Sequence, residues 1–183
     1  METTIGQVHL AIVQGDITGQ GDVDAVVNAA NAYLAPGGGV AGAIHRAAGP
    51  RLAQACAPLA PIAPGQAVLT PAFDLPNRCV IHCLGPVYGV DRPEAELLAS
   101  CYRNALCLAE EHGLASIALV AISTGVFGYP MAEAAEVALR TVIAAAPRLH
   151  RVHLVRFCLA DDRALATFER IAATLLPSPA GDS

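Results

Sequence analysis

Lysine and tryptophan are absent from this sequence, and aromatic side chains make up only 4% of its 183 residues. Without lysine the protein cannot form a Schiff base with a substrate, and it lacks the lysine with which P-loops hold phosphate groups. So few aromatic rings leave few walls for a pocket that takes a flat ligand. Hydrophobic residues reach 54% and charged residues only 15%, which excludes disorder and favours a well-buried domain.

Positive charge is also scarce. All 11 basic residues are arginines scattered along the chain, and the formal net charge is −5. A basic stripe that could release counterions from a nucleic-acid backbone is missing, so we expect no direct binding to nucleic acid. No apolar run is long enough to span a membrane. A site for a polyanion must therefore rely on local backbone dipoles, acting against the overall charge.

The six cysteines could form three disulfides in a secreted protein. They lie mostly within apolar strand-like or helix-like runs, and the sequence shows no signal peptide, so we expect reduced core cysteines in a cytoplasmic protein. Cys79 and Cys83 are four positions apart rather than in a CxxC pair. We therefore predict no bound metal.

Predicted strands and helices alternate along almost the whole chain. This order favours an α/β sandwich with a largely parallel sheet, in a single domain over residues 1–176 followed by a loose tail at 177–183. The expected strands cover residues 8–14, 25–28, 67–71, 79–84, 117–122 and 152–158. The expected helices cover residues 40–48, 51–56, 93–112, 131–146 and 161–176.

Four polar turns follow strand ends, at residues 15–18, 28–39, 85–92 and 123–129. Ligands of parallel sheets bind beyond the carboxyl ends of the strands, so these turns are expected to form one cleft. Two of the turns, 28–39 and 123–129, carry glycines between a strand and a helix. The pair predicts a cleft with two loops suited to phosphate.

The stretch around which the chain is organised holds three consecutive glycines, Gly37, Gly38 and Gly39, before a helix that begins near Val40. Glycines let backbone N–H groups approach an anion, and a helix N-terminus adds partial positive charge. Taken alone, the glycines could equally form a tight strand-to-helix connection. Asn28 and Asn31 just before them offer uncharged donors and acceptors, which suit sugar hydroxyls.

Two other polar residues allow two interpretations each. Asp16 can cap a short helix, or it can accept a hydrogen bond from an exocyclic amine such as that of adenine. His82 falls within an apolar run, where a satisfied core histidine is favoured over a catalytic one.

Six ordered segments together resemble a macro domain, nearest the MacroD-type branch. The resemblance extends from about residue 8 to residue 176. It implies a three-layer α-β-α sandwich whose mixed, largely parallel sheet has six strands, and it implies ADP-ribose binding. Many macro domains also remove ADP-ribose from acidic side chains or deacetylate O-acetyl-ADP-ribose. The segments are QGDIT (14–18), VVNAAN (26–31), GGGVAGAIHRAAG (37–49), VIHCLGP (80–86), LLASCYRNAL (97–106) and STGVFGYP (123–130).

The same resemblance assigns roles to site residues. Asp16 would bind the adenine amine with support from the Ile17 backbone, and two backbone loops would hold the diphosphate. Asn28 and Asn31 would hold the distal ribose, with Phe127 packed against it. Leu159, or Phe157 in a shifted register, stands where an aromatic ring commonly stacks on adenine. The first loop comprises Gly37, Gly38, Gly39 and Val40, the second Ser123, Thr124, Gly125, Val126 and Phe127, and the predicted catalytic residues are Asn28, Asn31 and Gly39.

One departure concerns catalysis. The MacroD-type branch has an aspartate directly after GGGV, proposed to help activate water, and this chain has Ala41 there. The substrate's own diphosphate is then the expected activator of water, with Asp91 or Glu94 as alternative bases. The resemblance thus implies a slow, cofactor-free hydrolase.

Two alternatives remain beside this hydrolase. Ala41 favours a reader that binds ADP-ribose without turnover. A nucleotide-dependent oxidoreductase or kinase fits poorly, because GxGxxG after the first strand and a GK[ST] loop are both missing. The expected partners are ADP-ribose and ADP-ribosylated proteins or O-acetyl-ADP-ribose, bound by a cytoplasmic monomer.

Overall fold

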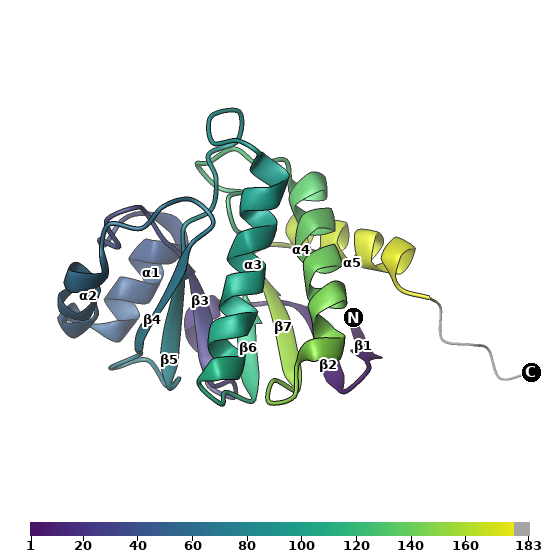
Figure 1. Cartoon of the computed structure of the whole chain (residues 1–183), viewed down its shortest axis with the longest axis horizontal. Helices are drawn as coiled ribbons and strands as arrows, with labels where there is room; N and C mark the ends of the chain where they lie inside the picture. The colour runs from purple at the N-terminus through teal and green to yellow at the C-terminus, as the bar shows by residue number, and fades with distance from the viewer. Residues whose placement is uncertain (178–183) are drawn as a thin grey trace, which may run out of the picture.

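Seven strands form one mixed sheet with the order β1-β2-β7-β6-β3-β5-β4 in the computed structural model, which describes residues 1–177 (Figure 1). The predicted loose tail at 177–183 lies almost wholly outside the described residues. The strands are β1 (Glu2–Ile5), β2 (Val8–Gln14), β3 (Ala25–Ala29), β4 (Ala67–Pro71), β5 (Cys79–Cys83), β6 (Ser116–Leu119) and β7 (Leu154–Leu159).

The five inner strands, β2, β7, β6, β3 and β5, run parallel to one another. The two outer strands, β1 and β4, pair antiparallel to β2 and β5. The prediction of a mixed, largely parallel sheet is therefore confirmed. The predicted count of six strands is wrong, because β1 adds a seventh. Its sequence, ETTI, has no apolar run to identify it, and it pairs with β2 through a tight turn at Gly6, whose φ is +60°.

Helices cover both faces of the sheet, which makes the predicted three-layer sandwich. Helices α3 and α4 pack side by side over one face, α1 packs against β3 on the other, and α5 contacts α4 and β2 (Figure 1). The helices are α1 (Gly39–Ala48), α2 (Pro50–Cys56), α3 (Glu94–Glu111), α4 (Met131–Ala145) and α5 (Asp162–Leu175), with short 3-10 turns at Ile17–Gly19, Ala57–Leu59 and Ala146–Arg148.

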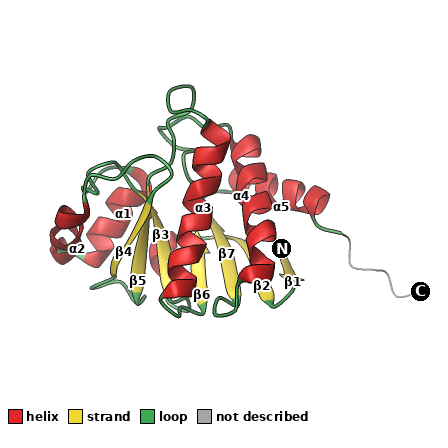
Figure 2. Ribbon diagram, viewed as in Figure 1, coloured by secondary structure: helices red, strands yellow, loops and turns green. Residues whose placement is uncertain are grey.

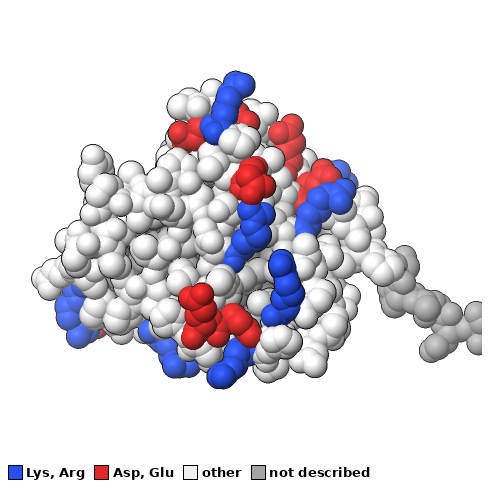
Figure 3. All heavy atoms as spheres, viewed as in Figure 1, with Lys and Arg blue, Asp and Glu red and all other residues white. Residues whose placement is uncertain are grey.

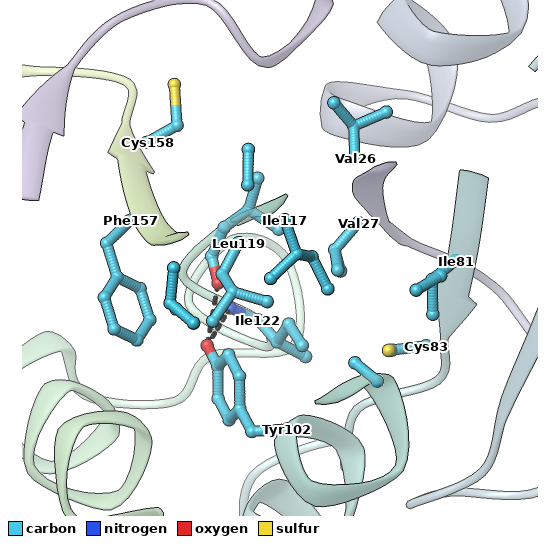
Figure 4. Packing of buried hydrophobic residues seen from close by; sticks show 14 of the residues in the cluster. Val26, Val27, Ile81, Cys83, Tyr102, Ile117, Leu119, Ile122, Phe157 and Cys158 are labelled. Atoms are coloured by element: carbon cyan, nitrogen blue, oxygen red, sulfur yellow. Dashed lines mark hydrogen bonds between the residues drawn. The ribbon is translucent and has the colours of Figure 1, made fainter. Parts of the chain in front are cut away.

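The middle of the core joins the sheet to α3 through Tyr102 (Figure 4). Its ring is fully buried, and its hydroxyl donates to the Val120 carbonyl at 2.7 Å and accepts from the Ile122 amide at 3.0 Å. These two bonds take up backbone groups that a longer strand would have used for pairing. Strand β6 accordingly ends at Leu119, and the predicted strand to residue 122 is too long by three residues.

All six cysteines are free thiols, as predicted. Burial raises the pKa of Cys101 to about 12, so this thiol stays protonated at neutral pH. Within residues 1–177, no helix combines the length and the apolar character that crossing a membrane requires.

Acidic and basic side chains are interspersed on the face shown in Figure 3. Arg103 pairs with Glu96 on α3, and Arg140 pairs with Glu136 on α4 at 2.9 Å. These two arginines are therefore locally neutralised.

Candidate functional site

The carboxyl ends of the parallel strands bring the predicted turns to one edge of the sheet. Gln14 at the end of β2 lies opposite Leu159 at the end of β7, and Ala29 of β3 lies opposite Cys83 of β5. The Gly15 amide then donates to the Leu159 carbonyl at 2.9 Å, which holds the first turn against β7. The loop between β5 and α3 also leaves this edge and forms the highest part of the view in Figure 2. The expected gathering of the four polar turns at one edge is confirmed.

The first glycine loop runs directly into α1. The helix begins at Gly39, whose φ of +55° favours glycine, and Gly38 is its N-cap. Asn31 fixes the turn before the glycines, since its carboxamide accepts from the Ala35 amide at 3.0 Å and donates to the Ala35 carbonyl at 2.8 Å. Among the residues that the structure describes, no acceptor takes a hydrogen bond from the N–H groups of residues 37–40. These donors stand at a helix N-terminus, where an anion is favoured.

Asn28 is held from inside the sheet. Its side chain is only 1% exposed, and its Nδ2 lies 3.0 Å from Nδ1 of His82 on the neighbouring strand. Nδ2 can only donate, so Nδ1 accepts and Nε2 of the neutral ring carries the proton, 2.9 Å from Oγ1 of Thr70. Burial lowers the pKa of His82 to about 3, which keeps the ring neutral. His82 is thus the satisfied core histidine that was predicted.

The second glycine loop closes on itself between β6 and α4. The Tyr129 amide donates to the Ser123 carbonyl at 2.9 Å, and the Gly128 amide donates to the Gly125 carbonyl at 3.0 Å. Ser123 has a φ of +68°, and Val126 at the tip is 100% exposed. In the described part of the chain, the N–H groups of residues 125–127 donate no hydrogen bond. The loop therefore offers a second set of backbone donors.

The loop between β5 and α3 braces the second glycine loop. The Tyr88 amide donates to the Phe127 carbonyl at 2.9 Å, and the rings of Tyr88 and Tyr129 lie 4.9 Å apart. Gly85 lies directly against Ser123, and a Cβ at position 85 would overlap the Ser123 Oγ. Only glycine fits there without moving the side chains of Ser123 and Ile122.

Asp91 and Glu94, the alternative bases, both have structural partners. The Asp91 carboxylate accepts from the Val87 amide at 2.8 Å and so stabilises its own loop. Glu94 opens α3 and lies 3.5 Å from Arg92. Both carboxylates therefore have a structural role within their own loop.

Asp16 has the capping role that the sequence allowed, and its adenine-binding role stays a prediction. Its Oδ1 accepts from the amide of Thr18 at 2.9 Å and from the hydroxyl of the same residue at 2.7 Å, which caps the turn at Ile17–Gly19. These bonds, the hydroxyl first, lower the pKa of Asp16. Oδ2 takes no part in the cap and remains an acceptor. Ile17 buries its side chain, so only its backbone can face a ligand.

The prediction that Leu159 faces adenine is wrong. The side chain of Leu159 is 1% exposed, and that of the alternative, Phe157, is fully buried against Tyr102 and Phe168. The first exposed residue after β7 is Ala160. Because both faces of this inner strand are covered, Phe157, Cys158 and Leu159 are all buried and no alternation marks the outward side chain.

Two buried polar atoms at this edge have no partner among the described residues, Oδ1 of Asn28 and Oγ of Ser123. Both ring nitrogens of His45, in the last turn of α1, are likewise buried without a partner. Unsatisfied buried polar atoms are rare and costly, so they point to a bound ligand or to ordered water. Burial lowers the pKa of His45. The sequence analysis missed His45, although it lies four positions after Ala41 and hence on the same buried side of the helix.

Within residues 1–177, no group of three His, Cys, Asp or Glu side chains is arranged to hold a metal ion. A groove of about 480 Å³ lies between β4 and α3, lined in part by Ile62, Val68 and Leu108. It contains no predicted site residue.

The family model of the Macro domain matches residues 27–138. The chain belongs to the macro domain family. Among related macro domains, the O-acetyl-ADP-ribose deacetylase of Klebsiella pneumoniae (strain 342) is 49% identical over 172 residues, which cover 91% of this chain and 98% of the relative. The macro domain-containing protein CT2219 of Chlorobaculum tepidum is 48% identical over 167 residues, covering 91% of this chain and 96% of the relative.

Solved structures of macro domains share the fold over most of the chain. The Oceanobacillus iheyensis macrodomain with ADP has a TM-score of 0.92 and 41% identity, and the match covers 96% of this chain and 95% of that one. The Trypanosoma brucei macrodomain in complex with ADP-ribose has a TM-score of 0.82 and 38% identity, covering 90% and 69%. Nucleotide-containing ligands thus occupy two structures to which this chain is similar.

Proposed function

We propose that this macro domain binds ADP-ribose at the carboxyl edge of its sheet and hydrolyses ADP-ribosyl esters, either on acidic side chains or in O-acetyl-ADP-ribose. The observation that carries the proposal is the pair of loops, 37–40 and 125–127, whose backbone N–H groups have no acceptor within the described chain. The name of the Klebsiella pneumoniae relative, an O-acetyl-ADP-ribose deacetylase at 49% identity, supports the ester substrate.

The proposed pose follows the free donors and acceptors. Asp16 accepts from the adenine amine through Oδ2, and the diphosphate lies between the two loops. Asn31 retains one N–H beyond its bonds to Ala35 and uses it to orient a hydroxyl of the distal ribose. Phe127, half-buried at the second loop, packs against that sugar. Asn28 contributes the acceptor Oδ1 to the distal ribose. Nδ1 of His82 accepts from Nδ2 of Asn28, so Oδ1 points away from the His82 ring.

The proposed reaction needs no side-chain base. On an ADP-ribosylated acidic side chain, a water adds to C1″ of the distal ribose, the bond from C1″ to the carboxylate oxygen breaks, and the proton of the water passes to a diphosphate oxygen. In O-acetyl-ADP-ribose the water adds instead to the acetyl carbonyl carbon, the bond from that carbon to the ribose oxygen breaks, and the ribose oxygen takes up a proton as acetate leaves. The loop that contains Gly39 holds the diphosphate, and positioning of this kind can supply several kcal/mol of barrier reduction. Ala41 is 6% exposed and offers no proton acceptor, which makes a slow enzyme the expectation.

The decisive test is single-turnover cleavage of a protein that is ADP-ribosylated on glutamate. We expect release of ADP-ribose at high enzyme concentration. Asn31→Ala should lower the rate by about 10–100-fold and raise Kd by less, because orientation is lost more than binding. Asn104→Ala is the control, since this α3 residue bonds the Gly65 carbonyl and belongs to neither glycine loop. No cleavage above buffer would contradict the hydrolase.

The second candidate is a reader of ADP-ribose, favoured by Ala41. Calorimetry would then give saturable binding of ADP-ribose with no product formed, and Asn31→Ala would mainly reduce affinity. If ADP-ribose bound to neither the wild type nor any variant, both candidates would fail. In either case we take the partner to be an ADP-ribosylated protein or metabolite and the protein to be a cytoplasmic monomer.

A further inference from the structure

A chain of hydrogen bonds links the middle of β7 to the backbone of Asp16. The Arg156 side chain, 16% exposed, donates from both terminal nitrogens to the two carboxylate oxygens of Asp22, at 2.8 Å and 2.7 Å. Its Nη1 also donates to Oε1 of Gln20 at 3.0 Å. Nε2 of Gln20 in turn donates to the Asp16 carbonyl at 2.9 Å. The carboxamide of Gln20 therefore links the Arg156 side chain to the Asp16 backbone, so the position of Asp16 depends on that of Arg156.

This relay joins strand β7 to the turn that follows β2. Asp16 follows β2, while Arg156 lies on β7, four residues before the exposed Ala160. Gln20 also packs closely against the start of the turn, because a Cβ at Gly15 would lie only 3.1 Å from its Nε2. The Asp16 backbone is held through Gln20, and its Oδ1 is held by Thr18. The free Oδ2 is therefore fixed in direction.

We propose that Arg156, acting through Gln20, is a positioning residue that makes the site prefer adenine to 6-oxo bases. The inference rests on the proposed function, in which Asp16 faces the base. The 6-amino group of adenine donates to a carboxylate, whereas the 6-oxo group of hypoxanthine is an acceptor and is repelled by it. A carboxylate held in one direction cannot turn away to admit the oxo group. Without the relay, the Asp16 turn gains that freedom.

The experiment compares the Kd values of ADP-ribose and inosine diphosphate ribose by calorimetry. We expect the wild type to prefer ADP-ribose by about tenfold or more, as for a hydrogen bond to a charged acceptor. Gln20→Met and Arg156→Met should each lower that preference by about threefold or more, while Kd for ADP-ribose rises less than the preference falls. Arg140→Met, which breaks an exposed ion pair on α4, should change neither value.

A double-mutant cycle separates the relay from a general loss of stability. If Arg156 acts through Gln20, the double variant should show the same base preference as either single variant. Thermal unfolding checks that each variant is folded, and Gln20→Met keeps the test open if Arg156→Met does not fold. Additive effects, or an unchanged preference in folded variants, would overturn the relay while leaving ADP-ribose binding intact. A wild type that binds neither ligand would overturn the proposed function itself.

Discussion

Gly85 packs directly against Ser123, at the start of the second glycine loop. Replacement by alanine should destabilise the fold by about 1–3 kcal/mol, the usual cost of overpacking. It should also weaken ADP-ribose binding, because the new Cβ would overlap Ser123 and also Cγ2 of Ile122. Chemical denaturation and calorimetry measure the two effects.

A second substitution tests whether the overlap with Ser123 is the cause. In the double variant Gly85→Ala, Ser123→Gly, the hydroxymethyl group is gone and position 123 receives a residue suited to its φ of +68°. Part of the lost stability should return. A double variant that is less stable than Gly85→Ala alone would contradict this account.

His82 should make stability depend on pH on the acid side of neutrality. Its pKa is about 3 in the folded protein and near 6.5 when unfolded, because burial disfavours the charged ring. Between these values the unfolded chain binds the proton and the native state does not. Stability is therefore fully present above the unfolded pKa and falls with pH by up to about 1.4 kcal/mol per unit below it. The lowered pKa of His45 acts in the same direction.

Urea unfolding between about pH 7 and pH 5 measures this slope, in a range above the ordinary carboxyl pKa values. His82→Gln keeps a polar group between Asn28 and Thr70 and removes the titration. The variant should be less stable at pH 7, yet its stability should fall less steeply toward pH 5. An unchanged slope would mean that His82 is protonated in the folded protein.

The end of β6 depends on one hydroxyl from α3. Tyr102→Phe keeps the buried ring and removes the bonds to Val120 and Ile122, so these two backbone groups keep only their mutual bond of 3.0 Å. We expect a loss of about 1–3 kcal/mol in the free energy of unfolding, together with weaker ADP-ribose binding because the loop at 123–129 starts here. Tyr33→Phe is the control for unfolding, since Tyr33 is 73% exposed. Equal stability of the two variants would contradict the role of Tyr102.

Elements with strong local signals could be predicted from the sequence. Pro93 and Pro130 directly precede α3 and α4, and Asp161 caps α5 with its side chain, so these helix starts were predicted within one residue. Strand β1 could not be predicted in this way, because its first three residues are polar and only Ile5 is apolar. The early end of β6 also has no local signal, since its cause is a hydroxyl 18 positions away.

The site residues likewise divide into those with a local sequence signal and those set by contacts with distant segments. Glycines between a strand and a helix marked both backbone loops, and two asparagines marked the first. The contacts that orient those residues join distant segments, such as Asn28 with His82, 54 positions apart, and Gln20 with Arg156, 136 positions apart. No pattern within one segment could reveal them. Leu159 was misassigned because β7 is covered on both faces, which removes the alternation that would mark its outward residues.

At the scale of the whole molecule, a net charge of −5 should repel a ligand whose diphosphate carries two negative charges. The proposed contacts are backbone N–H groups without net charge, so salt screens them less than it would screen a charged side chain. Raising NaCl from about 50 to about 400 mM should therefore leave Kd for ADP-ribose within about twofold or tighten it, because salt screens mainly the repulsion. Calorimetry over this range measures the dependence.

Arg46 provides the contrary case. Its Nη1 would lie 3.0 Å from a Cβ at Gly42, so this guanidinium runs beside the first turn of α1. If Arg46 held the phosphates, affinity would fall as salt rises, as it does for contacts between cations and phosphates. Arg46→Gln would then abolish the salt dependence. That pair of results would replace the account based on backbone dipoles.

The inner strands all end at the same edge of the sheet, and this has a consequence for its stability. Turns that leave β2, β3 and the segment after β6 reach the same edge, so a single molecule seated across them would tie together strands that are separate in sequence. The sheet would then be most resistant to fraying where it is occupied. The outer strand β4 runs in the opposite direction, so the bound molecule would not protect it from fraying.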